Sequence, residues 1–134
     1  LDGANVEMYE RLGDDNMFLF GLHTEEIEKL RAGGYDPNAV AAADEEIMRV
    51  FDRFSQGFRD GKSYSDLVSM LLYGGDQYML IADYRAYADC QKKLYARIAD
   101  EREYARLALV NTAKSGVFAA DRAIAEYAHN IWNV

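Results

Sequence analysis

The sequence is poor in the residues that form covalent cross-links and metal sites. Its 134 residues include one cysteine, Cys90, and two histidines, His23 and His129. One cysteine excludes an internal disulfide, and these residues leave no Cys/His cluster at the spacing of a structural zinc site. We therefore predict no metal site. A reducing, cytoplasmic setting fits this cysteine usage.

Basic residues and long apolar runs are also scarce. Fifteen Lys and Arg stand against 23 Asp and Glu, which gives a net charge of −8, and Lys92-Lys93 is the only adjacent basic pair. Nucleic-acid binding needs clustered positive charge, so we predict no nucleic-acid partner. No apolar run approaches the roughly 20 residues that cross a bilayer, so we predict no membrane span and see no targeting segment.

What the chain does have is a hydrophobic share of 50%, enough for the core of one domain or of part of one. It begins at Leu1 without a methionine or a signal peptide, and a turn-to-helix motif is already under way at Asp2-Gly3. We therefore expect a piece cut from inside a longer protein, and residues 1–134 to form an incomplete domain.

Capping signals and helical periodicity predict six or seven helices. Asp2 begins a helix to about Leu12, Thr24 caps the next, and Asp36-Pro37 is a strong start signal for a third. That third helix is expected to run without a break along its apolar stripe as far as Phe58. A capping box at Ser63 and Asp66 predicts a fourth helix, and a cap at Asp83, after a connecting segment at 78–81, predicts a fifth. A further helix is expected over about 101–114, with a break at Ser115-Gly116. The last helix is expected from the apolar stripe between Ile124 and Ile131 and ends near Trp132.

One segment predicts a strand. Met17-Phe18-Leu19-Phe20 is an unbroken apolar run between turn residues, typical of a parallel strand buried on both faces. A lone strand cannot satisfy its own hydrogen-bond ladder, so a neighbour must come from elsewhere. The predicted fold class is therefore mostly α with one short parallel-type strand, as at the end of an open α/β domain. Exposed in a lone monomer, Phe18, Leu19 and Phe20 would favour association.

Four segments, in order, carry a family resemblance. They are 1–8, 16–21, 82–87 with Gln91 following, and 111–132, reading LDGANVEM, NMFLFG, ADYRAY and NTAKSGVFAADRAIAEYAHNIW. Together they resemble the C-terminal end of the α-glucan phosphorylases, the glycogen, starch and maltodextrin phosphorylase family. Each is weak by itself, but their order and spacing make the resemblance specific over nearly the whole chain.

The resemblance implies an enzyme that uses phosphate to release glucose 1-phosphate from terminal α-1,4-glucosyl units. Members carry pyridoxal phosphate on a lysine, and the cofactor's phosphate group shuttles a proton to the substrate phosphate. Catalysis takes place between two Rossmann-like domains of a glycosyltransferase-B fold. Residues 1–134 would be the C-terminal portion of the second, cofactor-binding domain, and the parent would be a homodimer.

The same resemblance implies that the catalytic machinery lies outside this chain. The family's cofactor lysine falls in a segment just before the one matched by 1–8, and none of the five lysines matches it: Lys29, Lys62, Lys92, Lys93 and Lys114. We therefore expect no catalytic or cofactor-binding residue here. The piece alone would be inactive and structural, with the rest of the phosphorylase chain as its partner.

Three polar residues are candidates for a supporting role near the cofactor. Asp2, Asn5 and Glu7 follow the position of the cofactor segment, although helix capping and turn formation explain Asp and Asn in such places more often. His129 near Glu126 suggests an acid–base pair, but an isolated surface histidine is the more common case.

Other features have ordinary structural explanations. Cys90 is more typical of a packed helix than of a reactive thiol. The tyrosines, among them Tyr84, Tyr87 and Tyr127, are more typical of core or domain-interface packing than of a sugar-binding platform. Arg122 and Glu126, four residues apart, should form a helical ion pair.

The chain departs from the family pattern in two places. Ala119-Ala120 replace two serines, which removes a helix cap, and Tyr104 stands where the family commonly has a tryptophan. The alternative function is a small acidic helical interaction module that works alone. The reading frame upstream of Leu1 discriminates the two, because only the phosphorylase hypothesis requires a lysine-bearing cofactor segment there.

Overall fold

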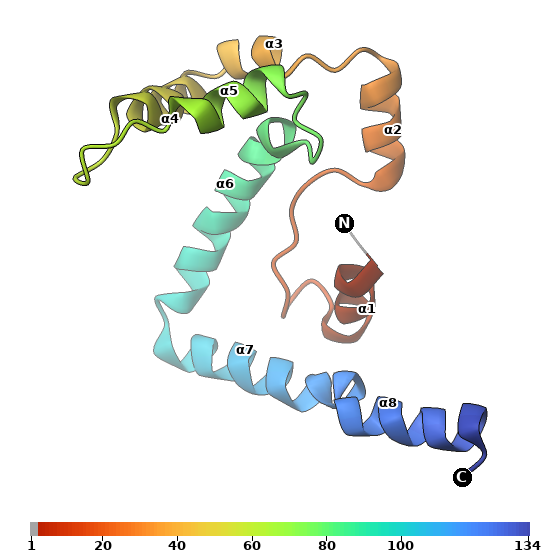
Figure 1. Ribbon diagram of the computed structural model, residues 1–134. Coiled ribbons are helices and arrows are strands. Elements are labelled where there is room, and N and C mark those ends of the chain that lie inside the picture. The colour runs from red at the N-terminus through yellow and green to blue at the C-terminus, as the bar shows by residue number, and fades with distance from the viewer. Residues whose placement is uncertain (1–2) are drawn as a thin grey trace. The chain divides into compact units, whose positions relative to one another are not determined.

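The computed structural model describes residues 3–134, and these are helical with no strand (Figure 1). They divide into two compact units. The first comprises residues 20–91 and the second residues 3–19 and 92–134. The predicted strand at Met17–Phe20 is therefore wrong for this chain. The segment is extended, but it has no backbone ladder, because the described residues offer no second strand to pair with it.

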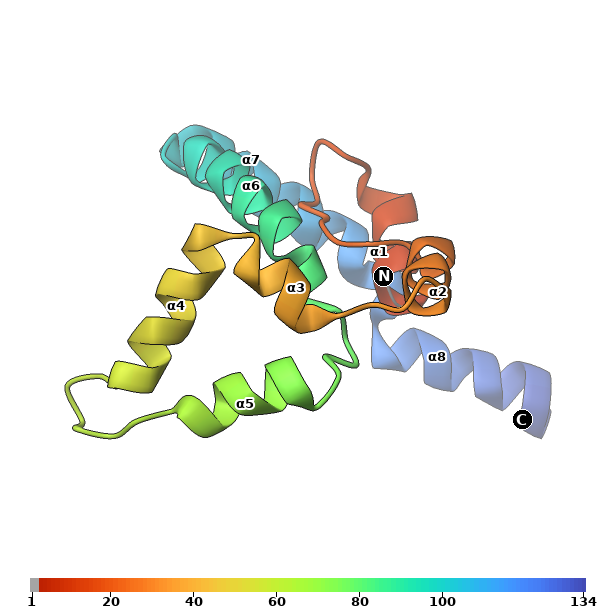
Figure 2. The same ribbon diagram turned by 90° about the horizontal axis from the view of Figure 1, so that it is seen from above.

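The first unit contains α2 (Thr24–Ala32), α3 (Pro37–Ala42), α4 (Glu45–Gln56), α5 (Ser65–Tyr73) and α6 (Leu80–Ile98) as far as Gln91. Helices α3, α4 and α5 contact one another in pairs, as Figure 2 shows from above. The buried centre of this unit is small and apolar. It consists of Ala41, Ile47 and Ile81, with partly buried side chains such as Phe51 and Leu72 packed around it.

Acidic caps decide where helices of the first unit begin. The carboxylate of Asp36 accepts a hydrogen bond from the Asn38 amide with Pro37 in the first helical position, which confirms the predicted start of α3. The predicted unbroken helix to Phe58 is wrong, because Asp44 has extended backbone between α3 and α4. Its Oδ1 accepts from the amides of Glu46 and Ile47, so a new helix starts there.

Three other predicted caps are corrected. Thr24 is the first residue of α2, and the cap position belongs to His23, whose amide donates to Glu26. The start of α5 has Tyr64 at its cap without a side-chain bond, so the predicted Ser63 and Asp66 capping box is absent there. Asp83 lies inside α6, because the helix begins at Leu80 within the predicted connecting segment.

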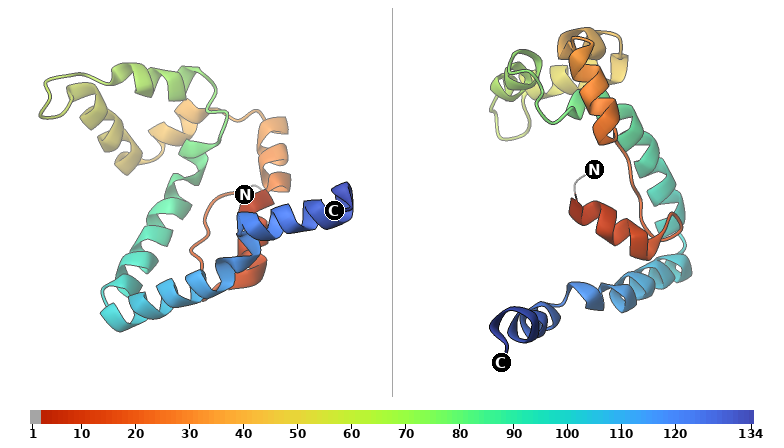
Figure 3. Two further views of the ribbon diagram at one scale, coloured as in Figure 1. Left: turned by 60° about the horizontal axis from the view of Figure 1, so that its bottom comes forward. Right: turned by 90° about the vertical axis from the view of Figure 1, so that its right-hand side faces the viewer.

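The second unit contains α1 (Gly3–Leu12), α7 (Glu101–Lys114), a 3₁₀ turn η1 (Ser115–Phe118), α8 (Ala120–Tyr127) and a π-helical turn η2 (Ala128–Trp132). The extent of α1, the range 101–114 and the helical end at Trp132 were all predicted. The predicted end of this helix at Ser115-Gly116 is confirmed, because α7 ends at Lys114 and the 3₁₀ turn follows. Ala119, with extended backbone, then separates η1 from α8. Figure 3 shows the C-terminal helices in blue from two further sides. Helix α1 contacts α7.

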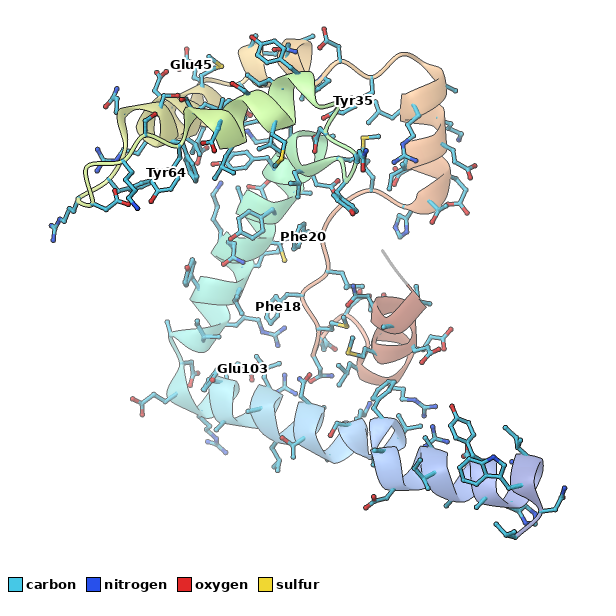
Figure 4. All side chains as sticks on the ribbon, viewed as in Figure 1. Phe18, Phe20, Tyr35, Glu45, Tyr64 and Glu103 are labelled. Atoms are coloured by element: carbon cyan, nitrogen blue, oxygen red, sulfur yellow. The ribbon has the colours of Figure 1, made fainter. Side chains whose placement is uncertain are left out.

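The extended segment 17–20 contributes side chains to packing in place of a sheet. Met17, Phe18 and Leu19 are half-buried, whereas Phe20 stays 44% exposed. Phe20, labelled in Figure 4, extends from this segment. Its ring meets that of Tyr87 edge-on, with ring centroids 5.2 Å apart. The chain itself therefore covers part of the apolar surface that was expected to be exposed. Within the segment, Phe20 is the side chain that stays most exposed to solvent.

Candidate functional site

The structure places two of the three residues predicted near a cofactor on α1. Asp2 lies outside the described residues. Asn5 is half-buried and Glu7 is exposed, and neither lines one of the hollows described below. Their supporting role therefore stays a prediction.

The residues considered for acid–base or metal chemistry do not cluster as metal ligands within residues 3–134. His23 and His129 are exposed, and Glu126 forms an ion pair with Arg122, which confirms that predicted pair. Cys90 is buried on α6, as expected of a packing cysteine. Within residues 3–134 no group of three or more His, Cys, Asp and Glu side chains could hold a metal ion. No helix in this range is long and apolar enough to cross a membrane.

The chain's own lysines do not fit a covalent pyridoxal-phosphate site. Such a lysine is activated by desolvation in a pocket or by a neighbouring cation. All five lysines here are exposed, and the ammonium of Lys114 donates to the carbonyl of Arg11 at 2.6 Å. No step of catalysis is assigned to them.

A buried aspartate that the sequence reasoning missed lies just before α6 and accepts hydrogen bonds from its first amides. Asp76 is 3% exposed and accepts three hydrogen bonds: from the Tyr35 hydroxyl at 2.8 Å and from the amides of Leu80 and Ile81 at 2.9 Å each. Burial, followed by this bond to Asp76, raises the pKa of Tyr35 above its usual range. The signal in the sequence was Gly74-Gly75-Asp76, a helix stop followed by a capping residue.

Asp83, the residue predicted to cap this helix, has a different partner. Its Oδ1 accepts the backbone amide of Leu22 at 2.9 Å, and its carboxylate lies against Gly21. Asp76 and Asp83 thus attach the segments around Tyr35 and Leu22 to the start of α6. Both bonds join residues distant in sequence, so neither follows from local pattern.

A charged network connects α4 to α6 within the first unit. The Arg85 guanidinium pairs with Asp44 and, at 2.6 Å, with Glu46, and the Tyr84 hydroxyl donates to Glu46 at 3.1 Å. The hydrogen bonds from Arg85 hold the pKa of Asp44 below its usual range. Each carboxylate of this network thus has a protein partner.

A second network fixes the loop at 14–16 to α7 in the second unit. Glu103 accepts from Arg106 at 2.8 Å and from Arg97 at 2.5 Å, and Arg106 also donates to Asn16 at 2.9 Å. Figure 4 labels Glu103 near the start of α7. The Arg106 bond, and then the Arg97 bond, lower the pKa of Glu103 to about 2. Asn111 adds a bond of 3.0 Å to the Asn16 carbonyl. Together these bonds tie the loop at 14–16 to α7.

Three hollows among residues 3–134 have mainly apolar linings. In the first unit a hollow of about 120 Å³ lies between α4, α5 and α6. We call it the apolar groove, and its lining is Ile47, Val50, Phe51, Leu71, Leu80, Ile81 and Tyr84. An adjoining hollow of about 280 Å³ shares Leu71 and Leu80 with it and also includes Met70 and Tyr78.

The second unit has a separate hollow of about 320 Å³. It is lined by Phe18 of the extended segment, Leu94 and Ile98 of α6, and Tyr104 and Leu107 of α7, among others. Tyr104 lines this hollow but is 56% exposed. Large exposed apolar side chains also continue along α8 and η2, where Ile124, Tyr127 and Trp132 are about half exposed.

Taken together, the described residues are helical and carry apolar hollows and internal ion pairs. A family model for carbohydrate phosphorylase matches residues 1–134. The chain belongs to the carbohydrate phosphorylase family.

Curated relatives support this assignment along the full chain. The chain is 39% identical over 137 aligned residues to the muscle form of glycogen phosphorylase from Ovis aries and, equally, from Homo sapiens. It is 41% identical to a glycogen phosphorylase from Synechocystis. Each alignment covers 100% of this chain but 16% of the relative. The chain therefore corresponds to about one sixth of a phosphorylase.

Proposed function

We propose that this chain is the C-terminal portion of the cofactor-binding domain of an α-glucan phosphorylase that depends on pyridoxal phosphate. The parent enzyme cleaves terminal α-1,4-glucosyl units with phosphate and releases glucose 1-phosphate. The observation that carries this proposal is the match to glycogen phosphorylases over all of the chain and 16% of their length. The homodimeric state and the cytoplasmic setting of the parent are part of the same proposal.

Within that enzyme, this segment has a structural role. Asp44, Glu46 and Glu103 are already paired with arginines, and Asp76 already has three donors. A general acid or base needs a group free to exchange a proton with the substrate, and these carboxylates are engaged in the fold. The lysine that binds the cofactor is supplied by the preceding part of the polypeptide, and this segment braces that part by packing against it.

The test is phosphorolysis by the full polypeptide and by the 134-residue chain. The full polypeptide is expected to release glucose 1-phosphate from a glucan and phosphate, and to lose this activity when pyridoxal phosphate is removed. The isolated chain is expected to release none. Activity of the isolated chain contradicts the structural role, and failure of the full polypeptide contradicts the assigned reaction.

The alternative, an independent helical interaction module, makes a different prediction about the gene. A start site immediately before the codon for Leu1, with no lysine-bearing cofactor segment upstream, supports the module. A reading frame that continues upstream through such a segment and a further domain contradicts it.

A further inference from the structure

Aromatic side chains cluster where α4 ends and the chain turns into α5. We call residues 52–64 the α4–α5 tip, and Figure 1 shows its loop at the ends of the two helices that lie away from α6. The rings of Phe54, Phe58 and Tyr64 lie with their centroids 5.4 to 6.5 Å apart. Phe54 and Tyr64 are half-buried, whereas Phe58 is 43% exposed. Two inner rings therefore support an outer ring that is open to solvent.

The tip is held in shape by its own hydrogen bonds. The amide of Tyr64 donates to the carbonyl of Phe54 at 2.9 Å, and the hydroxyl of Ser63 donates to the carbonyl of Ser55 at 2.8 Å. These bonds connect the two ends of the loop. Because the loop is already ordered, Phe58 loses little conformational freedom when a ligand binds, which favours recognition.

The polar groups around the exposed ring include both donors and acceptors. The guanidinium of Arg53 lies over the ring of Phe58, 5.3 Å from its centroid. Arg59 and Lys62 are exposed, and no ion pair is found for these three cations within residues 3–134. Asp60 is also exposed and accepts from the amide of Lys62 at 3.2 Å. The tip thus carries three cationic and two acidic side chains, which are nearly balanced.

This combination favours a neutral ligand with many hydroxyl groups. The negative face of an aromatic ring attracts the C–H face of a pyranose, and sugar hydroxyls can accept from guanidinium groups and donate to carboxylates. A polyanion would instead meet the two carboxylates as like charges. A purely apolar partner would remove water from charged groups without replacing it.

We propose that the α4–α5 tip is a surface site for the α-glucan polymer, with the ring of Phe58 stacked against a glucosyl unit. This inference rests on the proposed function, which supplies the glucan. A polymer held at more than one point dissociates more slowly than its individual contacts, so the tip keeps the polymer at the enzyme. A short malto-oligosaccharide gains nothing from a second point of attachment.

Amylopectin and maltoheptaose, tested with the full polypeptide, separate this role from catalysis. In Phe58→Ala, the Kd for amylopectin in affinity electrophoresis should rise by about fivefold or more, whereas kcat/KM for maltoheptaose should change by less than about twofold. Phe58→Trp keeps a large ring and should retain the affinity. Tyr95→Ala removes another exposed ring, 64% exposed on α6 and outside the tip, and should leave the Kd unchanged.

A second variant guards against loss of folding, because Phe58 packs on Phe54. Arg59→Ala removes an exposed donor and should raise the Kd for amylopectin by about two- to threefold. Unchanged amylopectin affinity in either folded variant overturns the proposal, and so does an equal loss of kcat/KM for maltoheptaose. Because electrophoretic binding needs no turnover, this result is read separately from a failure of the phosphorylase assay.

The salt dependence tests the competing kind of partner. Binding of a neutral glucan should change little between about 0.05 and 0.5 M NaCl, whereas binding of an acidic polypeptide should weaken steeply. Polyglutamate serves as the acidic probe. Salt-sensitive binding of polyglutamate at the tip, without binding of amylopectin, identifies an acidic-polypeptide site and overturns the proposal.

Discussion

The hydroxyl of Tyr35 lies 2.8 Å from Oδ2 of Asp76 and donates a hydrogen bond to it. This bond joins the segment before α3 to the residue that caps α6. Because Asp76 is buried with three donors, removing its carboxylate leaves buried N–H and O–H groups without an acceptor. Asp76→Ala should lower the free energy of unfolding in urea by about 3 kcal/mol, and Tyr35→Phe by about 1 kcal/mol.

A matched control separates the effect of losing the Tyr35–Asp76 hydrogen bond from the effect of removing any tyrosine hydroxyl. Tyr73 is 78% exposed, so Tyr73→Phe should change the free energy of unfolding by less than about 0.5 kcal/mol. If the double variant Tyr35→Phe/Asp76→Ala is destabilised by the full sum of the two single effects, the two residues are not coupled and the interpretation is wrong.

The ion pairs of Glu103 predict a dependence of stability on acid pH. Its pKa is lowered from 4.5 to about 2 in the folded chain, first by Arg106 and then by Arg97. A lowered folded pKa means that the contribution to stability is present above the unfolded value and is lost as the pH falls through 4.5 toward about 2. The stability gap between the native chain and Glu103→Gln should therefore close over that range in urea titrations.

Glu101 supplies the control for this prediction. It lies in the same first turn of α7 and is exposed, and no ion pair is found for it within residues 3–134. The gap between the native chain and Glu101→Gln should be small throughout. A gap for Glu103→Gln that stays constant from neutral to acid pH would contradict the assigned role of the two arginines.

Gly57 predicts a sharp stability effect at the end of α4. Its φ is +85°, and a Cβ added there would lie 2.1 Å from the carbonyl oxygen of Lys62. Gly57→Ala therefore combines an unfavourable backbone conformation with a clash against backbone, and it should cost about 3 kcal/mol or more of the free energy of unfolding. Differential scanning calorimetry and urea denaturation both measure this change.

Gly34 isolates the backbone contribution. Its φ is +80°, but a Cβ there meets nothing within 4 Å, so Gly34→Ala should cost only about 1 kcal/mol. Gly116 has neither a positive φ nor a close neighbour, and Gly116→Ala should be neutral or slightly stabilising. Equal losses at positions 57 and 34 would show that the contact with Lys62 is unimportant.

Local signals in the sequence predict much of the helical structure. Pro37 after Asp36 gives the start of α3, and the bounds of α7 follow from periodicity. The caps at Asp44 and Asp76 were missed because several acidic or polar residues lie near each helix start. The sequence does not show which of these side chains accepts the first backbone amides. Such choices are settled by tertiary contacts, as with Asp83, which bonds to Leu22 instead of capping its own helix.

The strand at Met17–Phe20 fails for a different reason. The apolar run satisfies the sequence rule for a buried parallel strand, but a strand is defined by pairing, and residues 3–134 offer no partner. The apolar groove could not be predicted from local sequence patterns either, because it also depends on contacts between residues that are distant in the sequence. Leu80, Leu71 and Ile47 come from three helices, and only the fold brings them into one groove.

The start of α8 carries a prediction about the departure from the family pattern. Ala119 occupies the cap position with extended backbone, φ −66° and ψ 132°, and makes no side-chain hydrogen bond to the first turn. This geometry suits a serine, whose hydroxyl can accept from an amide two or three residues later. Ala119→Ser should therefore raise the free energy of unfolding by about 0.5–1 kcal/mol.

Ala120→Ser, one position inside the helix, lacks the capping geometry and should be neutral or slightly destabilising. Hydrogen exchange of the amides of residues 121 and 122 measures the stability of the first turn of α8, and protection should increase only in Ala119→Ser. An equal increase in both variants would show that the added polarity, and not capping, accounts for the gain.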